Sequence, residues 1–375
     1  MTTPTEAISK IVGKPVSEIV KVNRYCAFEK STPNHIYCFT TPIFRADNDK
    51  VVGDRFVPGN RCFEFYGSNS VVKVSETSIQ FCRQNKIDEV FFPSKQIFVA
   101  LNSGKLLKSK DFVIYPTLNG ILVKSFIKTN RLPLMLQSYG SVKVKSNSKY
   151  FAFMSGEFEP QFTINAMYAE DDCGSVFFNT ELTVKKCADS VYEVEARSCK
   201  DATKVVYEMN LYEPKLIQDT TVESRRPNEN NVYGSISFMG KSPECGMQYL
   251  YSRVDVSKLG KIKDSEFDAV KLYVPYYMTT GVSLRLHTPF KRFCSFGSNW
   301  SNKIQSTDIH INSNIQKGFF VFDLSTHLLD KRGRLKANEG IVIRPCVADG
   351  RFSIIATADN YFTPQILQFN YKKGE

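Results

Sequence analysis

The stretch KVVYEMNLYE at residues 204–213 indicates the fold class of this chain. Successive side chains of an extended strand point to opposite faces, so residues two apart share a face. One face of this stretch carries Val205, Tyr207, Met209 and Leu211, whereas Val206, Glu208 and Asn210 lie on the other. The alternation predicts a β-strand that turns one apolar face toward a core.

Short alternating runs of the same kind continue in both directions from this stretch. They are divided by turn-forming residues and include SVVKVSET, DFVIYPTLNGILVKSFI, FTINAMYA and YEVEAR. The chain also contains 29 Phe and 18 Tyr, which pack well on a pleated surface. Asn119–Gly120 between two apolar runs predicts a type I′ hairpin turn, whose two central residues need positive φ. We therefore predict an all-β chain.

The chain length predicts two domains, because 375 residues exceed the size of about 250–300 residues at which a single core stops growing. Thr3, Pro4 and Glu6 match a capping box with proline at the first helical position, and they predict a short N-terminal helix that Gly13 ends. The residue pattern changes near Glu213–Pro214. The predicted parts are an N-terminal helix or arm at 1–24, a β-rich sandwich-like domain at 25–212 and a second β-sandwich at 213–375. The predicted architecture is two packed β-sandwich, jelly-roll-like domains.

The net charge of +11 raises the question of an anionic partner. The lysines are dispersed, and Lys143 and Lys145 fall on one face of a predicted strand, which favours a solvated face. The alternative that stays open is an anionic polysaccharide or a phosphate-rich wall polymer. Nucleic acid is not predicted as a partner.

The ten cysteines are widely and irregularly spaced, without a CxxC motif or a Cys/His cluster. The N-terminus lacks the basic start and apolar core of a secretory signal, and no stretch approaches the ~18–20 apolar residues that cross a bilayer. We therefore predict synthesis in the cytoplasm, no membrane insertion, buried free thiols rather than disulfides, and no zinc site.

The sequence offers few groups for catalysis. Its four histidines, at positions 35, 287, 310 and 327, are far apart in the chain, and no HExxH, GxSxG or phosphate-binding loop occurs. The adjacent Asp171 and Asp172 would point to opposite faces of a strand and could not form an acid/base pair. We predict that the protein is not an enzyme.

Residues 217–372 carry a series of motifs in a fixed order. They include QDTTVESRRPNENNVYG at 218–234, YLYSRVDVSKLG at 249–260, CSFGSNWSNKI at 294–304 and GFFVFDLSTHLLD at 318–330. In this order the motifs resemble the DNRLRE-domain family, a carbohydrate-binding-module-like β-sandwich of bacterial surface proteins and phages. The residues that match the family's motifs are Asp219, Pro227, Asn230, Gly234, Trp300 and Asn302. The family's second tryptophan is absent, because Trp300 is the only one in the chain.

The resemblance directs attention to exposed aromatic side chains with polar neighbours, since sugars present apolar C–H faces and hydroxyl edges. Trp300 with Asn299 and Asn302, and Tyr361, have that composition and are the candidate ligand-binding residues. Packing of Trp300 in a core or interface is the alternative. No cofactor is predicted, although Asp219 and Asp255 are candidates for a structural calcium ion.

The implied function is a non-enzymatic structural or adhesion protein. ISKIVGK at 8–14 and VSEIVKVN at 16–23 are similar to the first residues of phage tail and fibre proteins. We therefore expect a phage or tail-like-particle component, a fibre or appendage that contacts a glycan-bearing surface and forms a homo-oligomer or binds other particle subunits. It would be located on the virion, an extracellular particle or the cell surface. The alternatives are a bacterial cell-surface or appendage-forming adhesin, and the binding module of a polysaccharide-degrading enzyme.

Overall fold

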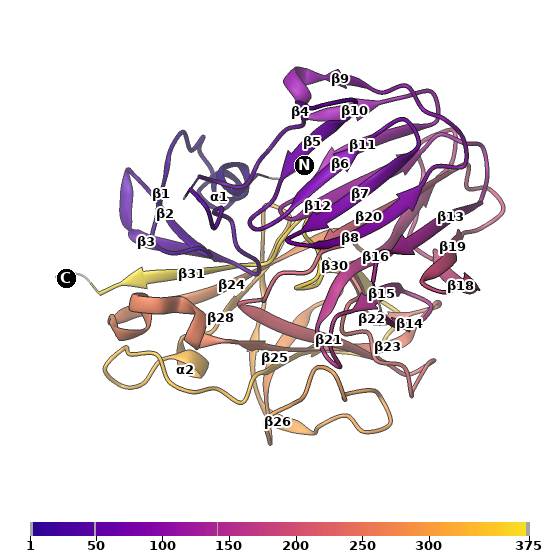
Figure 1. The fold of residues 1–375 in the computed structure, drawn as a ribbon. Helices are drawn as coiled ribbons and strands as arrows, with labels where there is room; N and C mark the ends of the chain where they lie inside the picture. Colours follow the sequence, from indigo (N-terminus) through magenta and orange to yellow (C-terminus); the bar gives the residue numbers. More distant parts are fainter. Residues whose placement is uncertain (1–2, 49, 141, 373–375) are drawn as a thin grey trace. The chain divides into compact units, whose positions relative to one another are not determined.

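A computed structural model describes residues 3–48, 50–140 and 142–372 of the chain (Figure 1). These residues divide into two compact units, which are considered separately. Unit 1 contains residues 45–213, and unit 2 contains residues 3–44 together with 214–372. In the described residues the strands form three sheets, and every strand pair is antiparallel. The prediction of an all-β chain is confirmed.

The predicted N-terminal helix is also confirmed, as α1 (Pro4–Val12). The Thr3 hydroxyl accepts a hydrogen bond from the Glu6 backbone N–H, and the Glu6 carboxylate accepts one from the Thr3 N–H at 3.0 Å. The helix ends at Gly13, whose φ of 82° lies in the left-handed region that glycine adopts without strain. Local capping rules therefore set both ends of this helix.

Unit 1 contains two sheets. The first sheet has the order β14 (Lys143–Ser146), β15 (Tyr150–Met154), β16 (Pro160–Glu170), β20 (Lys204–Leu211), β12 (Gly120–Ser125), β11 (Phe112–Pro116), β10 (Leu106–Lys108), β9 (Val99–Leu101), with β17 (Val176–Phe177) on β16. The second has the order β18 (Glu181–Ala188), β19 (Val191–Arg197), β13 (Arg131–Ser138), β8 (Lys86–Phe91), β7 (Ser78–Arg83), β6 (Val71–Val74), β5 (Phe63–Tyr66), β4 (Val57–Pro58). A short 3₁₀ helix, η1 (Asn102–Gly104), follows β9.

The two sheets of unit 1 share one hydrophobic core. The ring of Phe81 on β7 lies 4.7 Å from that of Phe162 on β16, measured between centroids. Tyr207, on the strand quoted first above, is fully buried; its hydroxyl donates to the Leu132 carbonyl and accepts from the Ala196 N–H at 2.9 Å. The opposite face of β20 is buried as well, including Glu208 and Asn210, so this strand lies between two packed layers of side chains.

The predicted hairpin at Asn119–Gly120 forms between β11 and β12, but its turn differs from the predicted one. The Thr117 N–H donates to the Gly120 carbonyl at 2.9 Å, and neither Asn119 nor Gly120 has a positive φ. Glycine is needed here for close packing instead, because a Cβ on Gly120 would lie 2.1 Å from the carbonyl oxygen of Met209 on β20. A neighbouring strand therefore explains this glycine.

Unit 2 is built on one large sheet. Its main path is β1 (Ile19–Lys21), β2 (Cys26–Glu29), β3 (Thr32–Phe39), β31 (Ile366–Tyr371), β24 (Phe267–Thr279), β30 (Phe352–Ala356), β22 (Ile236–Ser242), β23 (Gly246–Val254), β29 (Ile341–Pro345), β25 (Leu284–Pro289), β26 (Ser306–Asn312). The remaining elements of this unit are β21 (Ile217–Glu223) on β23, β27 (Asn314–Gln316), β28 (Phe319–Asp323), η2 (Val256–Asp264) and α2 (Ser325–Leu328). The long β24 pairs with β28 and β31 along its first part and with β30 along its last part.

Residues 25–44 belong to unit 2, whereas the sequence pattern places them in the first domain. β3 pairs with β31 from His35↔Asn370 to Phe39↔Ile366, and Figure 1 shows the indigo β3 beside the yellow β31. The Tyr25 hydroxyl also donates to the Pro214 carbonyl at 2.7 Å. The N-terminal strands thus complete the sheet formed by the C-terminal part of the chain, a pairing that alternation within each strand does not reveal.

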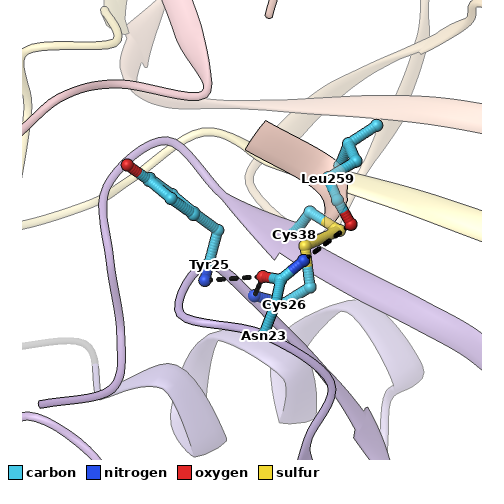
Figure 2. The surroundings of a disulfide bond; sticks show 5 residues. All are labelled: Asn23, Tyr25, Cys26, Cys38 and Leu259. Atoms are coloured by element: carbon cyan, nitrogen blue, oxygen red, sulfur yellow. Dashed lines mark hydrogen bonds between the residues drawn. A yellow bond between two sulfur atoms is a disulfide. The ribbon is translucent and has the colours of Figure 1, made fainter. Parts of the chain in front are cut away.

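Cys26 and Cys38 face each other across β2 and β3 and form a disulfide (Figure 2). The prediction of free thiols is wrong for this pair. Beside it, the Asn23 side chain accepts hydrogen bonds from the N–H groups of Tyr25 and Cys26 and donates to the Leu259 carbonyl. The other eight cysteines are free, but only Cys245 is buried, so the prediction of buried thiols also fails for most of them.

Candidate functional site

Two of the motif-bearing segments lie against each other in unit 2. The Asn230 side-chain amide donates to the carbonyl oxygens of Ser295 and Ser298, both at 2.6 Å. The Ser301 N–H donates to the Pro227 carbonyl at 2.9 Å. Residues named by the family resemblance therefore connect loop 225–234 to the loop that carries Trp300.

Trp300 is half-buried and packs against the unit rather than standing free. Its ring centroid lies 5.1 Å from that of Tyr249, and the Lys303 ammonium lies 4.2 Å from its centroid. The indole also packs on a small apolar cluster that includes Tyr251 and Phe293. Packing, the alternative considered for Trp300, accounts for all these contacts.

Asn299 and Asn302 are brought together with Trp300, but their polar groups serve the turn itself. The Asn302 side-chain oxygen accepts from the Asn299 N–H at 2.8 Å, and the Asn299 side-chain oxygen accepts from the Asn302 N–H at 3.1 Å. The Asn302 amide nitrogen donates to the Gly297 carbonyl. These reciprocal bonds fix the shape of the loop.

Tyr361 is only 2% exposed, so it cannot offer an aromatic face to a sugar. Its neighbour Asn360 is fully buried and donates to the Ser235 carbonyl at 3.1 Å and to the Tyr277 hydroxyl at 2.8 Å. The sequence pattern of an aromatic residue beside an amide is therefore part of a buried polar network at this position.

Asp255 and Asp219 are not brought together. Asp255 caps η2, accepts from the Ser257 N–H and hydroxyl, and pairs with Lys258 at 2.9 Å. Asp219 is buried, and its Oδ2 accepts from the Ala358 N–H at 2.7 Å. In residues 3–48, 50–140 and 142–372, no group of three or more His, Cys, Asp or Glu side chains could hold a metal ion. The two aspartates therefore bind partners of the chain's own.

Asp219 lies in a buried ionisable cluster with Lys215 and Asp359, which the sequence pattern did not single out. The Lys215 ammonium pairs with the Asp359 carboxylate, and both side chains are at most 6% exposed. Burial, and then repulsion by Asp359, raises the pKa of Asp219 from 3.8 to about 7. Burial also raises the pKa of Asp359.

The raised pKa of Asp219 predicts how the stability of unit 2 depends on pH. The folded state holds the Asp219 proton more tightly than the unfolded state, so this group's contribution to stability falls as pH rises from 3.8 to about 7. Asp219→Asn removes the titration, and denaturant unfolding of both proteins across this range would measure the difference. A difference in free energy of unfolding that stays constant with pH would contradict the prediction.

A cationic surface pocket lies beside the Trp300 loop and was missed by the sequence pattern. It has a volume of about 300 Å³ and is lined by Gln218, Arg253, Arg292, Phe293, Cys294, Ser295 and Phe296. The register of β21 and β23 sets Gln218 opposite Arg253, whose guanidinium donates to the Gln218 side-chain oxygen at 2.8 Å. Burial, and then repulsion by Arg292, lowers the pKa of Arg253. Two guanidinium groups at one pocket form a candidate site for an anion.

Three of the histidines that are far apart in the chain lie near one another in unit 2. The rings of His287 and His310 are 5.6 Å apart, and His327 Nε2 lies 2.9 Å from the Thr288 hydroxyl. His310 and His327 line a pocket of about 390 Å³ with Thr288, Thr326, Lys336 and Glu339. Burial lowers the pKa of His287 and of His327. Both ring nitrogens of His327 already contact threonine hydroxyls, which favours a structural role.

Comparison with models of protein families finds none that matches this chain, and comparison with curated proteins also finds no match. The DNRLRE resemblance therefore stays a prediction. Within the part of the chain that the structure describes, no helix has the length and apolar character needed to cross a membrane.

Proposed function

We propose that the protein is a non-enzymatic structural or adhesion protein that contacts a glycan-bearing surface through unit 2. In this proposal it is a component of a phage or tail-like particle, a fibre or appendage, built from sandwich-like, jelly-roll-type domains. The shared core of the two sheets in unit 1 supports a sandwich there. The ordered motifs of residues 217–372 support a carbohydrate-binding relative for unit 2.

The cationic pocket lined by Arg253 and Arg292, called the arginine pocket below, is the main support for this proposal. Guanidinium groups bind carboxylates and phosphates through paired hydrogen bonds, and aromatic side chains contact the apolar faces of sugar rings. The pocket combines Arg253 and Arg292 with the half-buried Phe296, whereas Phe293 is 4% exposed and packs in the apolar cluster beneath. Within the described residues Arg292 makes no hydrogen bond or ion pair, so its guanidinium is available to a ligand. These features favour a polysaccharide that carries carboxylate or phosphate groups.

An exposed edge of unit 1 supports self-association. β9 is the last strand of its sheet, and Val99 and Leu101 on it are 57% and 40% exposed, with Ile97 nearby at 75%. Edge strands offer unpaired backbone groups to another chain. A monomer at all concentrations in sedimentation experiments would remove the homo-oligomer from the proposal.

Two alternative functions can be distinguished from this proposal by experiment. A bacterial surface or appendage adhesin would be found on intact, unlysed cells, whereas a particle component would be released with particles. A binding module of a polysaccharide-degrading enzyme would accompany turnover of a glycan. The pocket lined by His310, His327 and Glu339 is where such turnover would be sought, and a purified protein inactive on a broad glycan panel would exclude it.

Binding to an immobilised acidic polysaccharide tests the arginine pocket. We expect the protein to bind polygalacturonate or a phosphate-bearing wall polymer, to ignore neutral dextran, and to bind less tightly as salt rises. Arg292→Glu should weaken binding at least ~10-fold, or about 1.4 kcal/mol, because it places a carboxylate beside Arg253.

The matched control is Lys291→Glu, which makes the same charge change at the neighbouring exposed residue outside the pocket. We expect this variant to bind within about two-fold of the unchanged protein, since a dispersed surface charge adds little. Equal losses in the two variants would show that net charge rather than the pocket drives binding. Failure to bind any acidic glycan would overturn the proposed ligand class.

A further inference from the structure

Three ionisable side chains lie near one another in the interior of unit 2. Lys215 lies directly before β21, and Asp359 lies in the loop between β30 and β31. Their side chains are in direct contact and are 5% and 6% exposed. Asp219, 3% exposed, interacts electrostatically with both. An amine and two carboxyl groups are therefore held together where water is excluded.

A buried ion pair between Lys215 and Asp359, with both groups charged, would be energetically unfavourable here. Removing two charges from water costs several kcal/mol per ion, and their attraction compensates only when the remaining lone pairs are satisfied. The Asp359 Oδ2 is buried and, among the described residues, has no hydrogen-bond partner. The second buried carboxyl of Asp219 adds like-charge repulsion. Neutral forms of all three groups, or a covalent product, avoid these costs.

We propose that Lys215 Nζ and Asp359 Cγ become joined by an amide bond within the folded unit, with Asp219 as the assisting acid and base. The feature goes beyond the proposed glycan contact, because it concerns how unit 2 is held together and not what it binds.

The chemistry balances without any further reactant. Transfer of a proton within the pair gives the neutral Lys215 amine and the protonated Asp359 carboxyl. The amine lone pair attacks Asp359 Cγ, so the Nζ–Cγ bond forms, and one Cγ–O bond breaks. Asp219 takes a proton from Nζ and returns one to the departing hydroxyl. The products are one amide and one water molecule, and Asp219 ends in its starting state.

The surroundings of Asp219 suit this task. The Ala358 N–H holds its Oδ2 at 2.7 Å, and the Gln365 amide lies 3.4 Å from the same oxygen. Burial gives Asp219 a pKa of about 7, so the carboxyl can accept and donate a proton near neutral pH. Reactants that the fold holds in contact reach effective concentrations far above those in solution, which is what an uncatalysed condensation lacks.

The bond would covalently join two parts of unit 2 that no strand pairing joins. β21 pairs with β23, whereas the loop that carries Asp359 connects β30, paired with β22 and β24, to β31, paired with β3 and β24. Lys215 and Asp359 lie near the two ends of the segment 214–372. A covalent link between them would close this part of unit 2 into a loop that resists pulling on either end.

Mass spectrometry of the denatured, full-length protein tests the proposal directly. After reduction of the Cys26–Cys38 disulfide, we expect a mass lower than the sequence mass by one water molecule. After trypsin digestion, cleavage after Lys215 should be blocked, and peptide 205–225 should appear joined to peptide 352–372. Free peptides 205–215 and 352–372 without the joined species, or a loss of water located elsewhere, would overturn the proposal.

Variants test separately the role of the reacting group Lys215 and the role of Asp219 as the assisting acid and base. Lys215→Met should restore the full mass. Asp219→Asn keeps both reacting groups and should also leave them unjoined, whereas Asp255→Asn, a carboxyl at the cap of η2, should leave the bond intact. A joined peptide in the Asp219→Asn protein would overturn the role of Asp219. Because the unchanged protein supplies the main result, poor folding of a variant leaves the test decisive.

Discussion

Phe162→Ala is expected to lower the free energy of unfolding of unit 1 by about 3–5 kcal/mol, the usual cost of removing a large aromatic side chain from a core. Phe162 is fully buried on β16. Its ring lies 4.7 Å from that of Phe81 on the second sheet and 6.1 Å from that of Phe153 on its own sheet. Removal of the ring therefore leaves a cavity where the two sheets meet.

Hydrogen exchange and denaturant unfolding of the full chain would measure this effect. We expect the amides of β12, β16 and β20 to lose protection while those of unit 2 keep theirs. Phe158→Ala is the matched control, because Phe158 lies just before the same strand but is 45% exposed. It should cost no more than about 1 kcal/mol. Equal losses in the two variants would contradict a core shared between the sheets.

Lys215→Met is expected to lower the free energy of unfolding of unit 2 by at least ~3–5 kcal/mol, because removing one partner of a buried pair leaves an uncompensated charge. Methionine keeps most of the length and apolar volume of the lysine side chain, so the loss reports on charge and not on packing. If the Lys215–Asp359 bond is present, its removal also frees a long loop, which chain entropy values at about 4–5 kcal/mol.

Lys258→Met is the corresponding surface control. Lys258 pairs with Asp255 at 2.9 Å, but both side chains are about one quarter exposed. Ion pairs of that kind contribute about 0–1 kcal/mol. Unfolding of both variants in denaturant, followed by exchange at the amides of β21 and β31, would compare them. A Lys215→Met protein as stable as Lys258→Met would show that the buried cluster contributes little.

Short-range features of this chain could be predicted from its sequence. The capping box at Thr3 and Glu6 places the start of α1, because those hydrogen bonds involve residues three apart. The alternation in 204–213 predicts β20, because the direction of a side chain in a strand depends only on its position along that strand. The all-β class follows from many such runs.

The candidate site could be predicted only in part. Trp300, Asn299 and Asn302 do lie together, because they are neighbours in one loop, but the pattern could not show that their groups are used within that loop. Tyr361 has the same kind of composition and is buried. Whether a polar or aromatic side chain faces water depends on what packs over it, and neighbouring residues in the sequence do not determine that.

Local patterns in the sequence determined the strands, the helix and their approximate ends. Only the tertiary structure decided that β3 joins β31, that Cys26 meets Cys38, that Arg253 and Arg292 share a pocket, and that Lys215 reaches Asp359. The physical reason is that the alternation of apolar and polar residues within one strand favours pairing with many strands to nearly the same extent. The choice of partner comes from burial and complementarity summed over the whole unit, and the functional groups are placed by that choice.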